Sequence, residues 1–472
     1  MTKITKTILT AILAIVGLSN VANAQFTKLF EFNTSNGRYP TGSLISDGTF
    51  LYGMAPLGGI NNKGVLFKVM PNGTGYVNLL DFGDIVTGTD TATGGKPGGS
   101  LFYDGTFLYG TASVGGKSYY YGTIFKIKPD GTGFLKLLDF NNTINGGVPY
   151  GSFISDGTFL YGVTSQGGTK GEGTIFKIKK DGTGYVKLYE FDNTANSNGS
   201  SPRGTLFSDG TFLYGTAGGG TNSKGTLFKI KTDGTGFTKL YDFDGTTNGG
   251  SPSSALTSDG TFLYGTTATG GGANIKGTIF KIMSDGTGYV KLLDFPGSWG
   301  SGDAGPLISI GSFLFGVTGY GGAYDYGTVF KIKTDGTGYV NLLSFGGTTP
   351  GLAPRGPLLS DGTSFYGMTL QGGTTNNGLV YKFDGAFTGI AETNREYGFA
   401  IYPNPANSEL AIEIVDYKNA TADIFNLKGQ LLQSTTLRSE KTTLQVADLS
   451  SGIYFIKVAN ASGVSVQKFI KE

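Results

Sequence analysis

Short apolar runs separated by glycine-rich polar segments fill most of the chain, and no stretch shows a helical period. Between residues 151 and 191, four such runs predict strands at Gly151–Ser155, Thr158–Thr164, Thr174–Lys179 and Tyr185–Phe191. An Asp-Gly pair follows the first and the third run, and this pair supplies the positive φ that a tight hairpin turn requires. The runs are apolar on both faces, which predicts a sheet that is covered on both sides.

This four-strand pattern is repeated along the chain. The octapeptide SDGTFLYG begins at Ser46, and its last glycine recurs at positions 53, 110, 162, 215, 265, 316 and 367. The intervals are 57, 52, 53, 50, 51 and 51 residues. Four antiparallel strands per repeat of this length are typical of a β-propeller blade, so the fold class predicted for residues 25–385 is a seven-bladed β-propeller.

The distribution of fourth strands predicts how the ring closes. Six repeats end in a run such as YVKLYEF (185–191), but the seventh stops after its third strand, Leu379–Phe383. The missing copy precedes the first repeat, because residues 26–32 read FTKLFEF. A ring sealed by this N-terminal strand leaves no exposed sheet edge.

Both ends of the chain depart from the repeat. Lys3 and Lys6, the apolar run Ile8–Leu18 and the segment Ala22–Ala24 follow the order of a secretory signal peptide, which predicts cleavage after residue 24. No other stretch is long and apolar enough to cross a membrane. Residues 386–398 form a predicted linker. Six or seven short strands in residues 399–472 predict a small immunoglobulin-like β-sandwich.

Composition excludes several classes of function. The net charge is +2 without a basic block, so nucleic acid is not an expected partner. The chain contains neither cysteine nor histidine, which excludes disulfides, thiolate metal sites and a Ser-His-Asp arrangement. The recurring aspartates are interpreted as turn formers rather than calcium ligands, because each precedes a glycine. We expect no cofactor and no metal.

Candidate site residues depart from the repeat on the long loops, which share one face of the predicted propeller. Aromatic residues can stack on sugars or peptides, and arginines can bind acidic groups. The predicted ligand-binding residues are Trp299, Tyr120, Tyr150, Tyr320, Tyr324, Arg203 and Arg355. Arg38 occupies the loop equivalent to those of Arg203 and Arg355 in the first repeat. Weak candidates for catalytic carboxylates are Glu172, Asp303 and Asp325.

Two parts of the sequence resemble known families. The pattern GT[IL]FK[IV]…DGTG[YF]…L[LY][DE]F over residues 26–385 resembles the tandem GloVer repeats of secreted and surface-anchored bacterial proteins, a family defined by its repeat rather than by an activity. The motifs YPNPA (402–406), IFNLKGQLL (424–432), DLSSGIYFIKV (448–458) and KFIKE (468–472) resemble the type A C-terminal sorting domain of the type IX secretion system. That resemblance implies a Bacteroidetes-type host, export by this machinery, and either release or attachment to surface lipopolysaccharide after removal of the domain.

The sequence thus predicts a secreted or cell-surface propeller that acts as a non-enzymatic binding module for extracellular polysaccharide or protein. Two alternatives stay open: a glycan-active hydrolase or lyase that uses acids on the long-loop face, and a structural surface protein. The fold does not choose among them, since propellers serve all three roles.

Overall fold

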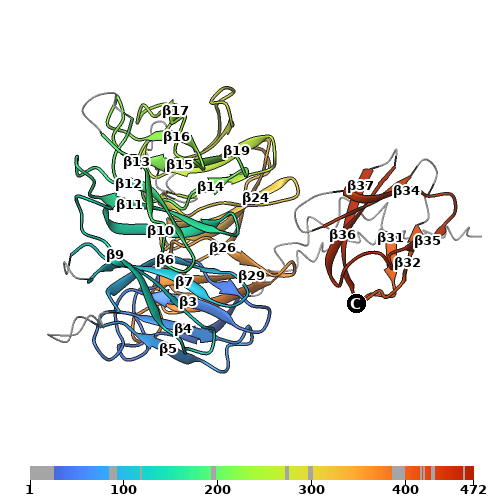
Figure 1. The fold of residues 1–472 in the computed structure, drawn as a ribbon, viewed down its shortest axis with the longest axis horizontal. Coiled ribbons are helices and arrows are strands. Elements are labelled where there is room, and N and C mark those ends of the chain that lie inside the picture. The colour runs from blue at the N-terminus through green and yellow to red at the C-terminus, as the bar shows by residue number, and fades with distance from the viewer. Residues whose placement is uncertain are drawn as a thin grey trace, which may run out of the picture. The chain divides into compact units, whose positions relative to one another are not determined.

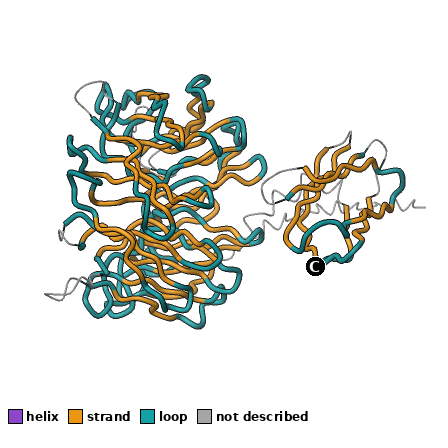
Figure 2. Tube along the Cα trace, in the orientation of Figure 1, coloured by secondary structure: helices purple, strands orange, loops and turns teal. Residues whose placement is uncertain are grey.

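The computed structural model describes residues 26–83, 93–116, 120–192, 198–252, 254–271, 276–295, 301–384, 399–414, 417, 420–426, 431–460 and 463–472. These residues contain strands, turns and loops but no helix, which confirms the all-β expectation (Figure 2). The chain divides into two compact units, Met1–Ala386 and Phe387–Glu472.

The described part of the first unit forms seven antiparallel sheets, numbered here 1 to 7 in chain order. Sheet 1 contains β2 (Ile45–Ser46), β3 (Leu51–Ala55), β4 (Val65–Val69) and β5 (Val77–Asp81). Sheet 2 contains β6 (Gly95–Tyr103), β7 (Leu108–Val114), β8 (Thr123–Ile127) and β9 (Leu135–Asp139). Sheet 3 contains β10 (Gly147–Ser155), β11 (Phe159–Gln166), β12 (Thr174–Lys179) and β13 (Val186–Glu190). Sheet 4 contains β14 (Phe207–Ser208), β15 (Phe212–Ala217), β16 (Thr226–Lys231) and β17 (Thr238–Asp242). Sheet 5 contains β18 (Thr257–Ser258), β19 (Phe262–Thr267), β20 (Thr278–Met283) and β21 (Val290–Asp294). Sheet 6 contains β22 (Ser301–Ala304), β23 (Ile308–Ile310), β24 (Phe313–Tyr320), β25 (Thr328–Lys333) and β26 (Val340–Ser344). Sheet 7 contains β27 (Leu352–Pro354), β28 (Leu359–Ser360), β29 (Ser364–Gln371), β30 (Leu379–Asp384) and β1 (Phe26–Glu31).

Each sheet buries apolar side chains against the next one. Separate hydrophobic clusters join sheets 1 and 2, 2 and 3, 3 and 4, 4 and 5, and 5 and 6. Phe315 of sheet 6 contacts Phe365 of sheet 7, with their ring centroids 4.9 Å apart. A further cluster joins sheet 7 to sheet 1, where β29 lies beside β3 and β4 although they come from opposite ends of the unit (Figure 1). Burial on both faces explains why the second strands, such as β3 and β11, have apolar side chains at consecutive positions.

The strand β1 lies at the edge of sheet 7 and pairs antiparallel to β30. Glu31 is opposite Leu379, Phe30 is opposite Val380, and a bulge follows before Lys28 meets Tyr381. In sheet 3, β13 pairs with β12 in the same register: Glu190 is opposite Thr174, Tyr189 is opposite Ile175, and a bulge precedes Lys187. The N-terminal strand therefore has the same register on sheet 7 that a fourth strand has on its own sheet.

The last glycine of the octapeptide lies where two side chains meet the second strand. A Cβ atom on Gly215 would lie 2.6 Å from Cζ of Phe228 and 2.9 Å from Cδ2 of Leu206. In the first six sheets, the equivalent glycine faces the phenylalanine of the third strand in the same way. Glycine recurs at this position because any side chain would overlap the neighbouring aromatic ring.

The aspartate of the octapeptide forms the first turn, as predicted, and it also reaches a buried tyrosine. Asp156 Oδ1 accepts hydrogen bonds from the backbone N–H groups of Thr158 (2.9 Å) and Phe159 (2.7 Å). Its Oδ2 accepts one from the Tyr161 hydroxyl at 2.8 Å. The same pair recurs in all sheets except sheet 6, where Ile310 and Phe315 replace the aspartate and the tyrosine together.

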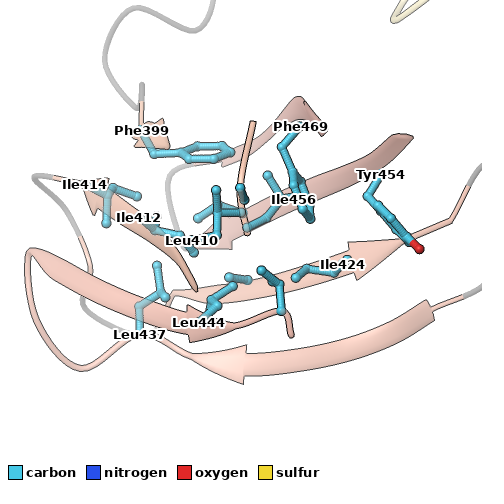
Figure 3. Packing of buried hydrophobic residues seen from close by; sticks show 14 of the residues in the cluster. Phe399, Leu410, Ile412, Ile414, Ile424, Leu437, Leu444, Tyr454, Ile456 and Phe469 are labelled. Atoms are coloured by element: carbon cyan, nitrogen blue, oxygen red, sulfur yellow. The ribbon is translucent and has the colours of Figure 1, made fainter. Parts of the chain in front are cut away.

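The second unit consists of two antiparallel sheets that share one core. One sheet contains β31 (Phe399–Tyr402), β32 (Glu409–Ile414) and β35 (Lys441–Gln445); the other contains β34 (Leu431–Thr436), β33 (Thr421–Phe425), β36 (Gly452–Asn460) and β37 (Gly463–Lys471). Buried residues of both sheets, among them Ile412, Leu444 and Ile456, form the cluster shown in Figure 3. Two sheets around one core is the arrangement that the sequence predicts for this region.

The two ends of the second unit are hydrogen-bonded to each other. The Ala406 N–H donates to the Ile470 carbonyl at 2.7 Å, and the Glu472 N–H donates to the Ala406 carbonyl at 2.9 Å. The side-chain oxygen of Asn404 accepts from the Ile470 N–H at 2.9 Å. The motifs YPNPA and KFIKE, far apart in sequence, thus form one structural element.

Candidate functional site

The chain passes close to its neighbour at or just before the first strand of each sheet, and six of the seven repeats have a glycine at this point, where the fifth has Ser254. A Cβ atom on Gly42 would lie 1.9 Å from the Gly99 carbonyl oxygen, and one on Gly99 would lie 2.2 Å from the Gly151 oxygen. A Cβ atom on Gly356 would lie 2.1 Å from the Gly42 oxygen, which connects sheet 7 back to sheet 1. The first strands therefore surround a common centre.

A cavity of about 420 Å³ lies at this centre and is lined by residues from all seven repeats. Its volume lies within the range of roughly 300–1,000 Å³ that is typical of small-molecule sites. The residues at its wall are the glycines of the close approach, the residues that flank them, and few others.

One position in each repeat, immediately before the close-approach glycine or its equivalent, varies strongly in chemistry. The three positions that follow vary much less: glycine or serine, then a small residue or proline, then leucine or phenylalanine. In sheets 1 to 7 the variable position holds Thr41, Gly98, Tyr150, Arg203, Ser253, Ala304 and Arg355. All of these except Gly98 and Ser253 line the cavity, and Ser253 lies outside the described residues. We call this set the rim position.

Three of the predicted ligand-binding residues are rim residues that the structure brings together at one cavity. Tyr150 and Arg203 are exposed at the cavity wall, and Arg355 is half-buried there. The Arg203 guanidinium carbon lies 5.5 Å from the centre of the Tyr150 ring, so the cation rests against the aromatic face. No aspartate or glutamate is among the described residues that line the cavity, so its charged side chains are cationic.

The cavity wall divides into a polar and an apolar arc at the position after the glycine. In sheets 1 to 4 this position holds Ser43, Ser100, Ser152 and Thr205, whereas sheets 5 to 7 have Ala255, Pro306 and Pro357. The hydroxyl oxygens connect neighbouring sheets: Ser100 Oγ accepts from the Ser43 N–H at 2.6 Å, and Ser152 Oγ accepts from the Ser100 N–H at 2.8 Å. Sequence reasoning missed these hydroxyl residues, although their place beside a recurrent glycine was a signal that could have revealed them.

A second depression, of about 240 Å³, begins at Arg203 and lies between sheet 4 and the segment that leads into sheet 5. Ser201, Arg203 and Pro252 line it together with the exposed Lys224 from the loop between β15 and β16. Arg203 belongs to both depressions, and the described residues that line the second one also include no acid.

The other predicted aromatic residues do not join this site. Tyr120, Tyr320 and Tyr324 are 68%, 46% and 63% exposed, and none of them lines the cavity. Trp299 lies outside the described residues. Arg38 donates its Nε–H to Asn377 Oδ1 at 3.1 Å and an Nη2–H to the Tyr39 hydroxyl at 3.0 Å, so it does not line the cavity either.

The three candidate acids are not assembled into a site among the described residues. The Glu172 carbonyl accepts a hydrogen bond from the Ser201 N–H at 2.7 Å, which makes this loop position a link between sheets 3 and 4. Asp325 closes its own loop, because its Oδ1 accepts from the Gly321 N–H at 2.9 Å. Asp303 lies in β22, and its side chain is outside what the structure describes. Neither Glu172 nor Asp325 lines the cavity.

Comparison with protein families identifies both parts of the chain. The model described as the Gloeobacter/Verrucomicrobia repeat matches residues 85–275 and 257–401, well over half of the sequence. The chain belongs to this repeat family. A second model, the secretion system C-terminal sorting domain, matches residues 400–472. Both resemblances predicted from the motifs are thereby confirmed.

The sorting domain fixes the destination of this Gloeobacter/Verrucomicrobia repeat protein. It directs the chain to type IX export and hence to the cell surface or the medium, as predicted. Among the described residues, no helix is long and apolar enough to span a bilayer. No match is found among curated proteins.

Solved structures resemble the chain only loosely. PorZ, a surface component of the type IX secretion system of Porphyromonas gingivalis, is 15% identical with a TM-score of 0.46, and the match covers 93% of this chain and 59% of PorZ. The extracellular domain of a putative one-component system from B. thetaiotaomicron is 13% identical (TM-score 0.48; 95% and 58% covered). An oligogalacturonate lyase in complex with manganese is 13% identical (TM-score 0.49; 76% and 93% covered). The chain spans less than two thirds of the first two proteins, and at these scores none of the three is evidence for a ligand or an activity.

Proposed function

We propose that the first unit is a seven-bladed β-propeller closed by β1, and that it serves at the cell surface as a non-enzymatic binding module for extracellular polysaccharide. The observation that carries this proposal is the central cavity, to which all seven repeats contribute and around which the strongly variable rim position is gathered. Ligand sites concentrate where variable side chains are held by a rigid scaffold.

Closure of the ring is supported by contacts of the β1 segment that match those of a fourth strand within its own sheet. The Phe191 N–H of sheet 3 donates to the Gly173 carbonyl at 2.9 Å, and the Phe32 N–H next to β1 donates to the Gly378 carbonyl of sheet 7 at 3.0 Å. Glu190 accepts from the Lys170 N–H in sheet 3, and Glu31 accepts from the Thr374 N–H in sheet 7. Residues 343 positions apart in sequence thus make the contact that elsewhere lies within one repeat.

A sugar chain fits the chemistry of the cavity wall. Sugars present hydroxyl groups at their edges and C–H groups on their faces, and the wall offers hydroxyls on one arc and alanine and proline on the other. Tyr150, exposed at the wall, provides a flat surface for stacking. The alternative of a glycan-active enzyme is less favoured, since no acid is among the described lining residues.

Export by the type IX machinery follows from the sorting domain. We further propose, from the order of charged, apolar and small residues at the N-terminus, that residues 1–24 are removed as a signal peptide. On the resemblance to the sorting domain, we propose that the host is of Bacteroidetes type and that the mature protein is either attached to lipopolysaccharide or released.

Incubation of the full chain with soluble and insoluble polysaccharides tests the proposal when both depletion of protein and new reducing ends are measured. Depletion without new ends, weakened by Tyr150→Ala but not by the matched control Tyr324→Ala outside the cavity, is the expected result. New ends that disappear in Glu172, Asp303 or Asp325 variants would establish the enzyme instead. No depletion and no new ends would refute polysaccharide binding and favour a protein partner or a structural role.

A further inference from the structure

We infer that the depression at Arg203 and Lys224 binds a tetrahedral oxyanion, that is, a sulfate or phosphate group. The site lies on sheet 4 and is separate from the ligand proposed for the central cavity. Inorganic sulfate and phosphate have the required chemistry, so the inference is testable without any polysaccharide and does not rest on the proposed function.

In three sheets, the loop between the second and third strands caps one of its own glycine N–H groups with a side chain. The acceptor is a side-chain oxygen four residues further along the loop. The pairs are Gly58 with Asn62 in sheet 1, Gly321 with Asp325 in sheet 6 and Gly372 with Asn376 in sheet 7, at 3.1, 2.9 and 3.0 Å. In sheet 3, the corresponding N–H donates to the Gly171 carbonyl at 3.2 Å. These four loops satisfy the donor internally.

The loop of sheet 4 lacks this cap. Its corresponding residues are Gly219 and Ser223, and Ser223 has a left-handed φ of 55°, as Asn62 (52°) and Asn376 (55°) have. The backbone is therefore similar, but the serine oxygen is one bond closer to the main chain than an asparagine oxygen. Within the part of the chain that the structure describes, neither the Gly219 N–H nor the Ser223 hydroxyl forms a hydrogen bond. Both residues line the depression, so a ligand there can use the free donor.

Two cations line the same depression. Arg203 rests against the Tyr150 ring, which orients the guanidinium but does not neutralise its charge. The Lys224 side chain is positioned by its stem, because a Cβ atom on Gly245 would lie 2.6 Å from Lys224 Cδ. Among the described residues, no carboxylate forms an ion pair with Arg203 or Lys224, and none lines the depression.

The combination of these groups is particular to sheet 4. Its rim position holds Arg203, and the residue before the glycine that ends its loop is Lys224. No other repeat has both an arginine and a lysine at these two positions. Sheet 1 has a lysine at the second position, Lys63, but its rim residue is Thr41 and its loop donor is capped.

The arrangement of donors favours a tetrahedral group. Arg203 comes from the segment before the first strand, whereas Gly219 and Lys224 come from opposite ends of the loop between β15 and β16. A phosphate or sulfate group presents three or more oxygens in different directions, while a carboxylate has two in one plane. Backbone N–H groups of glycine-rich turns together with a lysine are a common way to hold such an anion. The depression, about 240 Å³, is below the roughly 300 Å³ at which small-molecule pockets begin, so it suits one charged group.

Equilibrium dialysis of the full chain against labelled inorganic sulfate and phosphate, at constant ionic strength set with NaCl, tests the inference. We expect saturable binding of one ion per chain. Competition with dextran sulfate and with neutral dextran then identifies the natural source of the group. Displacement by dextran sulfate alone indicates an ester on a polymer, whereas displacement by neither polymer indicates a free ion.

Ser223→Asn is the most informative variant, because it restores the cap that sheets 1 and 7 have. It should weaken ion binding about 10-fold or more, as expected for loss of a hydrogen bond to a charged group, without lowering Tm. Ser223→Ala, which leaves the N–H uncapped, should bind within about threefold of the unmodified chain.

Charge variants test the two cations. Arg203→Gln and Lys224→Gln should each weaken ion binding about 10-fold. Lys63→Gln is the matched control, since it removes a lysine from the same repeat position in sheet 1, where the loop donor is capped, and it should change affinity less than about twofold.

Three outcomes would overturn the inference. Acetate that competes as well as sulfate would replace the tetrahedral group by a carboxylate. Unchanged affinity in Ser223→Asn would remove the Gly219 N–H from the site. Absence of saturable binding of either ion up to about 10 mM would remove the site altogether. None of these results bears on polysaccharide binding at the central cavity, whose test uses Tyr150→Ala, so failure of one proposal is distinguishable from failure of the other.

Discussion

Replacing Asp156 by alanine removes the acceptor of three hydrogen bonds and leaves one buried donor, the Tyr161 hydroxyl, without this partner. The backbone N–H groups of Thr158 and Phe159 lie in an exposed turn, so water can replace the carboxylate there. Tyr161 is only 3% exposed, and its hydroxyl donates to Asp156 Oδ2. Loss of that acceptor is the principal cost, because a buried polar group without a partner is destabilising by about 1–3 kcal/mol.

The expected size of the effect is a loss of about 2–4 kcal/mol, which combines the unsatisfied hydroxyl with the weakened turn. A unit of roughly 360 residues has a melting entropy of about 0.8 kcal/mol/K, so this loss lowers Tm by about 3–5 °C. Calorimetric melts of the full chain at pH 7 measure the shift. Asp181→Ala is the matched control in the same sheet: its carboxylate accepts only from the exposed Thr183, so we expect a much smaller change.

Sheet 6 provides the decisive comparison, because Ile310 and Phe315 stand there in place of the aspartate and the tyrosine. If the pair acts as a unit, Asp156→Ile with Tyr161→Phe should cost less than the sum of the two single changes by at least about 1 kcal/mol. Strict additivity, or an Asp156→Ala melt within 1 °C of the unmodified chain, would refute the role assigned to the buried hydroxyl.

The effect should also depend on pH. Burial by itself would raise the pKa of Asp156, but hydrogen bonds from Phe159, Tyr161 and Thr158 outweigh it and lower the pKa below its ordinary value. A carboxylate with a lowered pKa stabilises the fold fully above its unfolded pKa of about 3.9, and this contribution is lost as the pH falls through the folded value. The difference in Tm between Asp156→Ala and the unmodified chain should therefore shrink as the pH is lowered below about 4.

Three further predictions concern packing and closure. In chemical denaturation, Gly215→Ala should destabilise the fold by about 1–3 kcal/mol, because the new Cβ would overlap Phe228. Gly98→Ala should not destabilise the fold, since no atom lies within 4 Å of its Cβ. Equal effects of the two changes would contradict the steric explanation. Lys177→Met should lower stability by about 1–2 kcal/mol in the same assay. The reason is that Lys177 Nζ lies 4.9 Å from the Phe159 ring centre and donates to the Thr232 carbonyl of the next sheet at 3.0 Å. An unchanged denaturation midpoint would show that this contact between sheets contributes nothing. Hydrogen bonds from Lys28 and Thr374 lower the pKa of Glu31 to about 2. The Glu31 carboxylate should therefore hold β1 on sheet 7 above about pH 4.5 and release it as the pH falls toward 2. Glu31→Gln should accelerate hydrogen exchange at Thr374 near neutral pH, and unchanged exchange would argue against a role in closure.

Strand positions were predictable because each repeat has the same pattern of apolar runs and Asp-Gly turns. In the third repeat, the strand predicted at Thr174–Lys179 has those bounds in the structure, and the one predicted at Tyr185–Phe191 is observed at Val186–Glu190. The first strand was predicted too short: β10 begins at Gly147 rather than Gly151, because Gly147 and Pro149 pair with β11 before the first strand reaches the centre. Such pairing depends on the long loop that precedes the strand, and loops carry no periodic signal.

The site was predictable only in part, for a geometric reason. Arg203 and Arg355 were selected from the sequence for their chemistry and their place before the first strand, Tyr150 was selected as an aromatic residue of the long loops, and all three line the cavity. Tyr120, Tyr320 and Tyr324 were selected on the same grounds of chemistry but come from positions further along the repeat, and none reaches the cavity. Distance from the centre is set by the order of strands within a sheet, which chemistry alone does not reveal.

The repeat itself explains why the rim position can vary without cost to the fold. The close-approach glycine, the octapeptide glycine and the turn aspartate each contact a neighbouring strand or sheet, so a change at any of them disturbs packing that recurs around the unit. A rim side chain such as that of Arg203 or Tyr150 is directed to solvent and to the cavity, and its replacement leaves those contacts intact. In an array whose stability is approximately a sum over units and interfaces, positions outside these recurrent packing contacts can diversify one repeat at a time. The presence of Thr41, Tyr150, Arg203, Ala304 and Arg355 at the same position of otherwise similar repeats is consistent with such diversification.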